Sequence, residues 1–304
     1  MAIAKRQVTR IETDESLHSL LPYGSPEFPF AYYDDSIMEY EGRTIGWHRH
    51  EAFECSLIEE GPVHCRVFRH HYVLDQGDMV FLNSQAVHSF SGSRGGRIKN
   101  IIFGPEFLSP SSGSVYREYV EPVLNSSLTH FALYKNAASN AGILQEMRQC
   151  CLDAEQDRDG LQMLKLQSDV NRLWQELFPR IMADPSGNTS SHAGTLPKRV
   201  QNRGHLILDY LHAHYGERIK VDDIARAVHI SRREVLRCFS ACFGTTPISY
   251  LNEYRVLQAQ ELLSQSDLSV TETALTCGFD NPGYFCKVFR EKTGTTPLRF
   301  RAGG

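Results

Sequence analysis

The chain has 304 residues, of which 41% are hydrophobic and 22% are charged. This length exceeds what one hydrophobic core usually supports, so we expect about two domains. No apolar run of about 18 residues occurs, and residues 1–10 lack an apolar core, which excludes a membrane helix and a secretory signal. The eight cysteines form no CxxC pair. This pattern is typical of free thiols in the cytoplasm, where we expect the protein to act.

Charge is divided unevenly along the chain. From Pro197 to the end, 15 Lys and Arg stand against 11 Asp and Glu, whereas the remainder holds 17 against 25. A basic segment attached to an acidic one is typical of a polyanion-binding module fused to another domain. The net charge of −4 therefore does not exclude a nucleic acid partner.

The first part of the chain, Phe30–Phe107, reads as a series of short strands. Stretches such as Val63–Phe68, Met79–Leu82 and Ile98–Phe103 are separated by turn residues. Many short strands at close spacing indicate a sandwich or a barrel.

Two helices are predicted next, at Ala141–Gln156 and Leu161–Met182, because apolar residues recur there at helical spacing. The segment Ala183–Gly194 is rich in Gly, Ser and Pro and predicts a flexible linker. From about Arg203 the chain is predicted to be helical to its end. We therefore expect an α+β protein of two domains, residues 1–182 and 203–304, joined by a linker over residues 183–202.

The C-terminal third contains an internal repeat. The sequence GTTP at Gly244–Pro247 recurs at Gly294–Pro297, and a Phe stands five residues before each copy, at Phe239 and Phe289. Each unit predicts a short helix, a tight turn and a second helix. This is a helix-turn-helix motif, present twice in an all-helical domain.

Capping residues delimit the second helix of each motif. Ser231 is a candidate N-cap with Glu234 completing a capping box, and Asn281 is the N-cap candidate of the second copy. Gly244 and Gly294 are candidate C-terminal stops.

Each of these second helices has an apolar side and a basic side. Phe239 and Phe289 lie on the apolar sides, whereas Arg237 and Lys287 lie on the opposite sides. A lone basic face usually indicates only a solvated surface. Two copies with the same buried aromatic and the same outward base favour two helices that enter the major groove of double-stranded DNA.

The second motif carries a specific set of residues: Ala259, Leu262, Leu263, Ala274, Gly278, Phe279, Tyr284, Phe285, Phe289, Gly294 and Pro297. Over about the last hundred residues, this set resembles the AraC/XylS family of transcription regulators. The resemblance implies a long helix over Ile248–Ser264 that bridges the two motifs. It also implies a homodimer that binds DNA and works with RNA polymerase.

The resemblance and the outward faces together define the candidate DNA-binding residues. They are Arg232, Arg233, Leu236, Arg237, Ser240, Asn281, Gly283, Cys286, Lys287 and Arg290. Leu236, Gly283 and Cys286 are poor hydrogen-bonding choices, so we expect readout to depend on the basic residues and on DNA shape.

The strand-rich part contains the pattern GX5HXHX3EX6G over residues 42–61, with His48, His50 and Glu54 in its polar positions. The pattern resembles the first motif of the cupin barrel. His88 occupies the histidine position of the second motif. That second motif departs from the cupin pattern at Asn83, Gln85 and Gly92.

These four side chains have two interpretations. Three histidines and a carboxylate suit zinc, iron(II), manganese or nickel, so His48, His50, Glu54 and His88 are candidate metal ligands. Alternatively, they line a pocket for an organic effector and no metal is required, with Arg66 as a further candidate contact. Because sugar-responsive members of the family have similar HXH…E segments, the resemblance implies a mono- or disaccharide effector.

The expected function is a ligand-responsive, non-enzymatic activator of carbohydrate uptake or catabolism genes. The helices at Ala141–Gln156 and Leu161–Met182 resemble dimerisation helices of such regulators, although their apolar stripes could equally pack against the barrel. One alternative is a metal-dependent cupin enzyme with an accessory DNA-binding domain. Another is a thiol switch at Cys150–Cys151 or at the pair Cys238 and Cys242.

Overall fold

The computed structural model describes residues 11–14, 17–92, 95–156, 160–183 and 193–302. It divides into two compact units, Met1–Lys198 and Arg199–Gly304. Residues 184–192 of the expected linker lie outside the described residues. Its C-terminal end differs from the expectation, because residues 193–195 form a strand and a helix begins at Lys198, before the expected start at Arg203. Within the described ranges, every helix is too short or too polar to span a bilayer.

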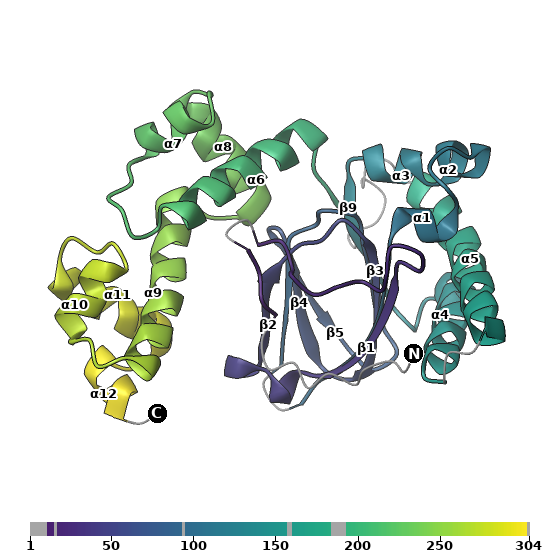
Figure 1. The fold of residues 1–304 in the computed structure, drawn as a ribbon, viewed down its shortest axis with the longest axis horizontal. Helices are drawn as coiled ribbons and strands as arrows, with labels where there is room; N and C mark the ends of the chain where they lie inside the picture. The colour runs from purple at the N-terminus through teal and green to yellow at the C-terminus, as the bar shows by residue number, and fades with distance from the viewer. Residues whose placement is uncertain (1–10, 15–16, 93–94, 157–159, 184–192, 303–304) are drawn as a thin grey trace. The chain divides into compact units, whose positions relative to one another are not determined.

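The N-terminal unit is a β-sandwich made of two antiparallel sheets (Figure 1). One sheet has six strands in the order β1-β8-β3-β6-β9-β10, and the other has four in the order β2-β7-β4-β5. The strands are β1 (Phe30–Ser36), β2 (Thr44–His48), β3 (Phe53–Glu60), β4 (Val63–Val67), β5 (His70–Leu74), β6 (Met79–Leu82), β7 (His88–Ser91), β8 (Arg97–Phe103), β9 (Leu128–Leu133) and β10 (Ala193–Thr195). The predicted strand-rich region and the α+β class are confirmed.

Strand register determines what faces the interior of the sandwich. Residues directly opposite one another in an antiparallel pair share a face of the sheet. Glu54 on β3 lies opposite Leu82 on β6 and Ile102 on β8, and Leu82 lies opposite His130 on β9. The neighbouring positions therefore face the other way. Phe53, Phe81, Phe103 and Phe131 belong to the apolar core on that outer face.

Helices cover this outer face. The helical elements of the unit are η1 (Ile37–Glu39), η2 (Glu41–Arg43), α1 (Pro105–Leu108), α2 (Ser114–Tyr119), α3 (Glu121–Asn125), η3 (Ala138–Asn140), α4 (Ala141–Ala154) and α5 (Gly160–Ala183). The apolar stripe of α5 is buried in the same core as the strand aromatics, and the Trp174 ring lies 4.8 Å from that of Phe53. The two predicted helices are confirmed, and their buried stripes pack against the six-stranded sheet.

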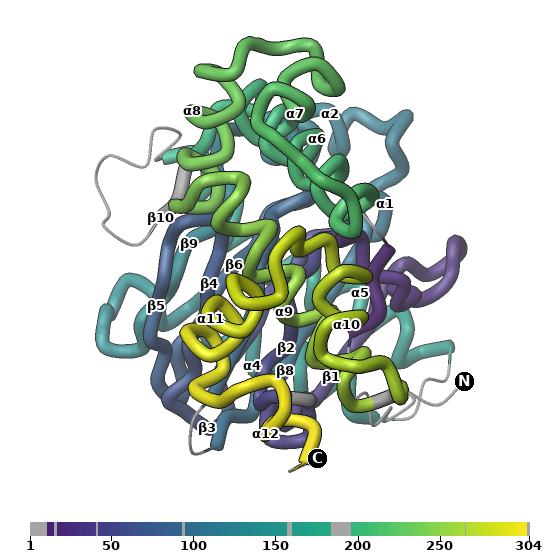
Figure 2. Tube along the Cα trace, turned by 90° about the vertical axis from the view of Figure 1, so that its left-hand side faces the viewer, coloured from purple at the N-terminus to yellow at the C-terminus, as the bar shows by residue number. Residues whose placement is uncertain are grey.

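The C-terminal unit is entirely helical. Its helices are α6 (Lys198–Ala213), α7 (Val221–Ala227), α8 (Arg232–Phe243), α9 (Pro247–Gln265), α10 (Val270–Thr276), α11 (Pro282–Thr293) and α12 (Pro297–Ala302). α7 with α8 and α10 with α11 form two helix-turn-helix motifs, and α9 runs between them (Figures 1 and 2). The predicted bridging helix is therefore present within about one residue of its expected bounds.

The predicted caps of α8 and α11 are in place. Ser231 Oγ accepts a hydrogen bond from Glu234 N at 3.2 Å, and Asn281 Oδ1 accepts one from Tyr284 N at 3.0 Å. Gly244 and Gly294 end the helices with φ values of 68° and 75°, where a side chain would be strained. The predicted capping box at Ser231 is only half formed, because the Glu234 carboxylate binds arginines instead.

A buried arginine joins the second motif to the loop that precedes the first. Arg255 on α9 donates hydrogen bonds to the carbonyl oxygens of Tyr215 (2.8 Å) and Glu217 (2.6 Å), and its guanidinium lies 5.6 Å from the centre of the Phe279 ring. Gly278, with φ at 78°, allows the chain to pass close to Tyr215 at this point. These contacts hold the second motif against the loop that follows α6.

Two buried carboxyl groups meet between α4 and α5. Asp153 binds Lys165 through Oδ1 and Gln149 through Oδ2, whereas Asp169 binds Arg172 through Oδ1. Burial and the neighbouring Asp153 carboxylate raise the pKa of Asp169 from 3.8 to about 6, against the opposing effect of Arg172. Protonated Asp169 therefore stabilises the fold below about pH 4, and this contribution is lost as the pH rises through about 6.

Asp169→Asn should remove this pH dependence, because an amide can donate to Asp153 and accept from Arg172 at any pH. We expect the wild-type free energy of unfolding to fall more steeply than that of the variant between pH 4 and 6, and the variant to be the more stable at pH 8. Both tryptophans, Trp47 and Trp174, lie in this unit, so tryptophan fluorescence during urea titration reports its unfolding alone. The exposed Glu121→Gln is the charge-matched control. Parallel curves for wild type and Asp169→Asn would contradict the assignment.

Candidate functional site

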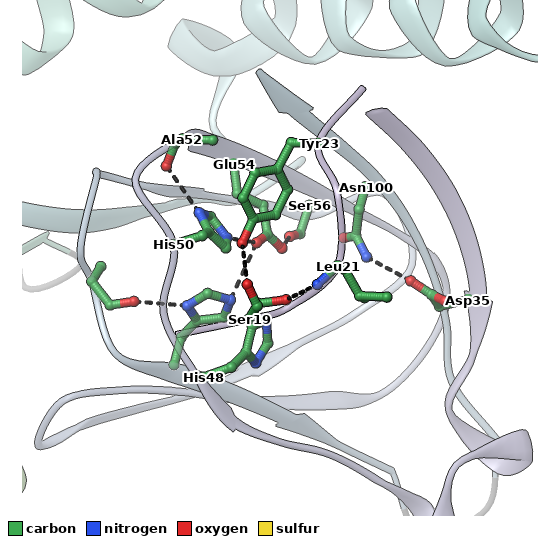
Figure 3. Close-up of polar contacts among 12 residues, drawn as sticks. Ser19, Leu21, Tyr23, Asp35, His48, His50, Ala52, Glu54, Ser56 and Asn100 are labelled. Carbon is green, nitrogen blue, oxygen red and sulfur yellow. Dashed lines mark hydrogen bonds and ion pairs between the residues drawn. The ribbon is translucent and has the colours of Figure 1, made fainter. Parts of the chain in front are cut away.

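Four polar side chains converge inside the sandwich, and Figure 3 labels three of them, His48, His50 and Glu54. His48 ends β2, His50 follows it, Glu54 lies on β3 and His88 begins β7. All four are buried, and one ligand atom from each lies within 4.8 Å of all the others. Side chains that are up to forty residues apart in the chain thus form a single group.

The three histidines have a common hydrogen-bond arrangement. The Nδ1 of each ring lies close to a backbone carbonyl oxygen two residues away: His48 to Gly46 at 2.8 Å, His50 to Ala52 at 3.0 Å, and His88 to Ala86 at 2.8 Å. A carbonyl oxygen only accepts, so each Nδ1 carries the hydrogen. In a neutral ring the Nε2 lone pair is then left for another partner.

Glu54 lies beside two of these Nε2 atoms. Its Oε2 is 2.8 Å from His50 Nε2 and 3.2 Å from His88 Nε2, and its Oε1 accepts a hydrogen bond of 2.6 Å from Ser56. A carboxylate oxygen and an imidazole lone pair are both acceptors. At these distances they require a positive charge between them, which an extra proton or a metal ion supplies.

Burial and neighbouring side chains set the protonation of His48 and Glu54. Burial, assisted by His88, lowers the pKa of His48 well below its ordinary value, so the ring is neutral at pH 7. Burial opposes ionisation of Glu54, but His88 and His50 beside it hold its pKa well below its usual range. Imidazole nitrogens and a carboxylate are ligands that a divalent transition metal binds, so the group could hold such an ion in place of the shared protons.

A cavity of about 20 Å³ adjoins the group. Its lining is Ile11, Ser19, Leu21, Tyr23, Tyr33, Asp35, Tyr40, Ile45, His48, His50, Glu54, Phe90, Asn100 and Ile102. The space suffices for a water molecule or an ion. No Lys or Arg occurs among the described residues that line it.

Arg66 lies outside the cavity, contrary to the expectation that it contacts the effector. It is exposed on β4, where it alternates with the buried side chains of Cys65 and Val67. The period-2 alternation of a strand therefore directs Arg66 away from the cavity.

The structure adds polar lining residues that the sequence analysis did not single out. Asp35 accepts hydrogen bonds from Tyr40 Oη at 2.7 Å and Asn100 Nδ2 at 3.0 Å, and burial raises its pKa to about 6. His130, also inside the sandwich, is hydrogen-bonded to Tyr72 Oη at 2.7 Å. Strand alternation could have placed these residues only once the register between strands was known.

The outward faces of α8 and α11 match the expected pattern. Val235 and Phe239 of α8, and Phe285 and Phe289 of α11, are buried. On the opposite faces, Arg232, Arg233, Arg237, Ser240, Gly283, Lys287 and Arg290 are exposed, as is the cap residue Asn281, whereas Leu236 and Cys286 are half-buried.

The basic side chains on these faces differ in their partners. Arg237 forms a bidentate pair with Glu234, Arg232 lies 3.2 Å from Asp222, and Lys287 lies 3.9 Å from Glu291. Arg233 and Arg290 have no carboxylate within 4 Å among the described residues, which leaves their charges available to an anionic partner such as a phosphate.

Comparison with known families matches both units. Residues 37–165 match the AraC-like ligand binding domain, and residues 224–303 match a helix-turn-helix domain. The chain belongs to the AraC family of transcription regulators. This family is not one of enzymes, so the alternative of a metal-dependent cupin enzyme is set aside. In an AraC-family regulator, the helix-turn-helix unit binds DNA and the N-terminal unit binds an effector.

Relatives of this regulator extend along most of its length. An uncharacterised HTH-type transcriptional regulator of Bacillus subtilis, YdeC, is 26% identical over 95% of this chain and 97% of its own. The HTH-type transcriptional activator RhaS of Yersinia pestis is 27% identical over 84% of this chain and 88% of its own. The DNA-binding domain of AdpA, solved with a target DNA, is 37% identical over 33% of this chain and 90% of its own, with a TM-score of 0.32.

The candidate thiol switches are poorly placed for reaction. Cys150, Cys151, Cys238 and Cys242 are all buried. Burial raises the pKa of Cys150 and that of Cys151, the latter to about 12, so the reactive thiolate is disfavoured at neutral pH. These buried cysteines are therefore poor candidates for a thiol switch.

Proposed function

We propose that this AraC-family protein is a cytoplasmic activator of carbohydrate uptake or catabolism genes, with a neutral mono- or disaccharide as effector. The observation that carries the proposal is the cavity lining. It contains two carboxylates, histidines, tyrosines and an amide, and no Lys or Arg among the described residues. Such a lining suits hydroxyl groups better than a phosphate or a carboxylate. The HXH…E segment of sugar-responsive family members supports the same effector class, and the activator RhaS supports the sign of regulation.

Effector binding must rearrange the cavity, because about 20 Å³ holds an ion or a water molecule but not a sugar. Leu21 and Tyr23, which precede the first strand, line the cavity beside the histidines, and the Tyr23 ring lies 5.1 Å from that of His50 (Figure 3). Displacement of this segment would open the site. Regulation follows if the sugar binds the opened arrangement more tightly than the closed one.

We also propose that a divalent metal ion occupies the sandwich, held by His48, His50, Glu54 and His88. Such an ion would supply a Lewis-acidic centre for hydroxyl oxygens. The carbonyl oxygens of Gly46, Ala52 and Ala86 orient the imidazoles and keep their protons on Nδ1, and Ser56 orients Glu54.

On the DNA side, we propose that α8 and α11 enter successive major-groove segments through the ten candidate residues named from the sequence. A homodimer through α4 and α5 would place two such units on one operator and present them to RNA polymerase. Exposed apolar side chains on these helices, Leu152, Leu161 and Leu164, support that interface.

Added zinc, manganese or nickel should raise the melting temperature of metal-free protein, because an ion at about a hundred times its Kd adds about 2.7 kcal/mol of stability. His50→Ala and His88→Ala should abolish the rise and the stoichiometric metal found by elemental analysis. His71→Ala, on the exposed face of β5, should retain both. Equal responses in all three variants would show that the ion binds elsewhere.

Neutral sugars should raise the melting temperature and change the gel-shift affinity for DNA upstream of neighbouring genes, whereas the corresponding sugar phosphates should not. Asn100→Ala, which changes the cavity lining, should weaken both responses, and the exposed Arg66→Ala should leave them intact. A response to the phosphates, or none to any sugar across a broad panel, would count against the proposed effector.

A further inference from the structure

Glu234 lies between two arginines at the start of α8. Its Oε1 and Oε2 accept hydrogen bonds from Arg237 Nη2 (2.6 Å) and Nε (2.9 Å), and Arg203 of α6 also binds Oε1 through Nη1. The side chain of Glu234 is 24% exposed and that of Arg203 20%, whereas Arg237 is 54% exposed. The carboxylate is thus partly shielded, and one of its two cationic partners extends into solvent.

The contact with Glu234 leaves one end of the Arg237 guanidinium directed elsewhere. A guanidinium has five N–H donors in a planar fork, and the bidentate contact uses Nε–H and one hydrogen of Nη2. Nη2 also lies 3.5 Å from Cys238 Sγ, which is only a weak acceptor. The end formed by Nη1 and Nη2 carries two nearly parallel donors directed away from Glu234, and a base edge would replace only this contact with sulfur. Two such donors match the N7 and O6 acceptors of guanine in the major groove.

An isolated exposed pair three residues apart in a helix would hold an arginine only weakly, because solvent screens the attraction. Here Arg203 binds the same carboxylate from another helix, so Glu234 has less freedom to move with Arg237. The three charges still sum to a positive value, which keeps the cluster attractive to DNA.

The second motif lacks this device. Tyr284 stands where the first motif has Glu234, and Lys287 stands where it has Arg237. Tyr284 Oη accepts a hydrogen bond from Asn252 at 3.2 Å, and the nearest described carboxylate to Lys287 is that of Glu291, at 3.9 Å. An exposed lysine held so loosely acts as a mobile point charge, which suits a phosphate better than a base edge.

We propose that Glu234 is a positioning residue that orients Arg237 to read one guanine, so that α8 supplies most of the base specificity and α11 mainly supplies phosphate affinity. The inference rests on the proposed entry of α8 into the major groove. It adds that specificity at one operator position depends on a side chain that does not itself touch the base.

The test is selection of binding sites from a random duplex pool by the full-length protein, followed by gel shifts on the selected site and its single-base variants. At one position of the selected site, wild type should prefer guanine, whereas Arg237→Ala should bind all four bases equally well. Glu234→Ala should reduce that preference about tenfold at this position alone, as expected for loss of a well-oriented bidentate contact. It should not weaken binding to unrelated DNA, because it removes a negative charge. Glu234→Gln should have an intermediate effect and covers the case in which the alanine variant fails to fold.

Glu291→Gln, the matched loss of a carboxylate beside Lys287, should leave every base preference unchanged. A merely structural role for Glu234 would instead lower affinity evenly for all sequences, which would overturn the inference. The inference would also be overturned if both Glu234 variants kept the guanine preference and Arg237→Ala lost it. That outcome would leave base reading by Arg237 intact. No effect of Arg237→Ala would overturn both the inference and the proposed contact on which it rests.

Discussion

The pairing of β3 with β6 and β8 is the constraint on which the N-terminal unit depends. Successive side chains on a strand face opposite sides of the sheet, and this register turns Glu54 and Ser56 inward and Phe53 and Cys55 outward. A shift by one residue would bury the polar set under the helices and expose the aromatic set to the cavity. The same register thus creates both the polar group inside the sandwich and the apolar surface that holds α5.

This arrangement places the candidate site and the helical layer on opposite faces of one strand. Phe53, adjacent to Glu54, packs against Trp174 of α5. A change in the position of β3 would therefore alter the packing of the helices proposed to form the dimer. A packed core resists gradual deformation, so β3 is suited to two discrete packing arrangements against the helices. An effector would favour the arrangement that it binds more tightly.

The helix-turn-helix unit uses a different kind of constraint. Its two motifs are similar in sequence, yet each is held by its own contacts: Arg255 joins the second motif to the loop after α6, and Glu234 joins α8 to α6 through Arg203. The repeat is therefore symmetric in its buried aromatics and asymmetric in its surface charges. That asymmetry is the physical basis for assigning the two DNA-facing helices different tasks.

Local patterns were sufficient for much of this protein. Hydrophobic periodicity, the GTTP repeat and the capping residues predicted the strand-rich region, the helices and both helix-turn-helix motifs, because each depends on neighbours within a few residues. The resemblance to the two cupin motifs also singled out His48, His50, Glu54 and His88. Arg66 was misplaced because it was chosen for its polar chemistry, whereas the alternation of Val63, Cys65 and Val67 around it directs it outward.

Residue patterns alone were enough to predict which segments form strands and helices, and to name candidate contacts for a metal, a sugar and DNA. Three features became visible only in the folded chain: Asp35 and Asn100 line the cavity, each histidine of the group directs Nδ1 to a carbonyl oxygen, and Glu234 binds arginines instead of closing a capping box. The reason is that these features depend on strand register and on contacts between distant segments, which local periodicity does not encode.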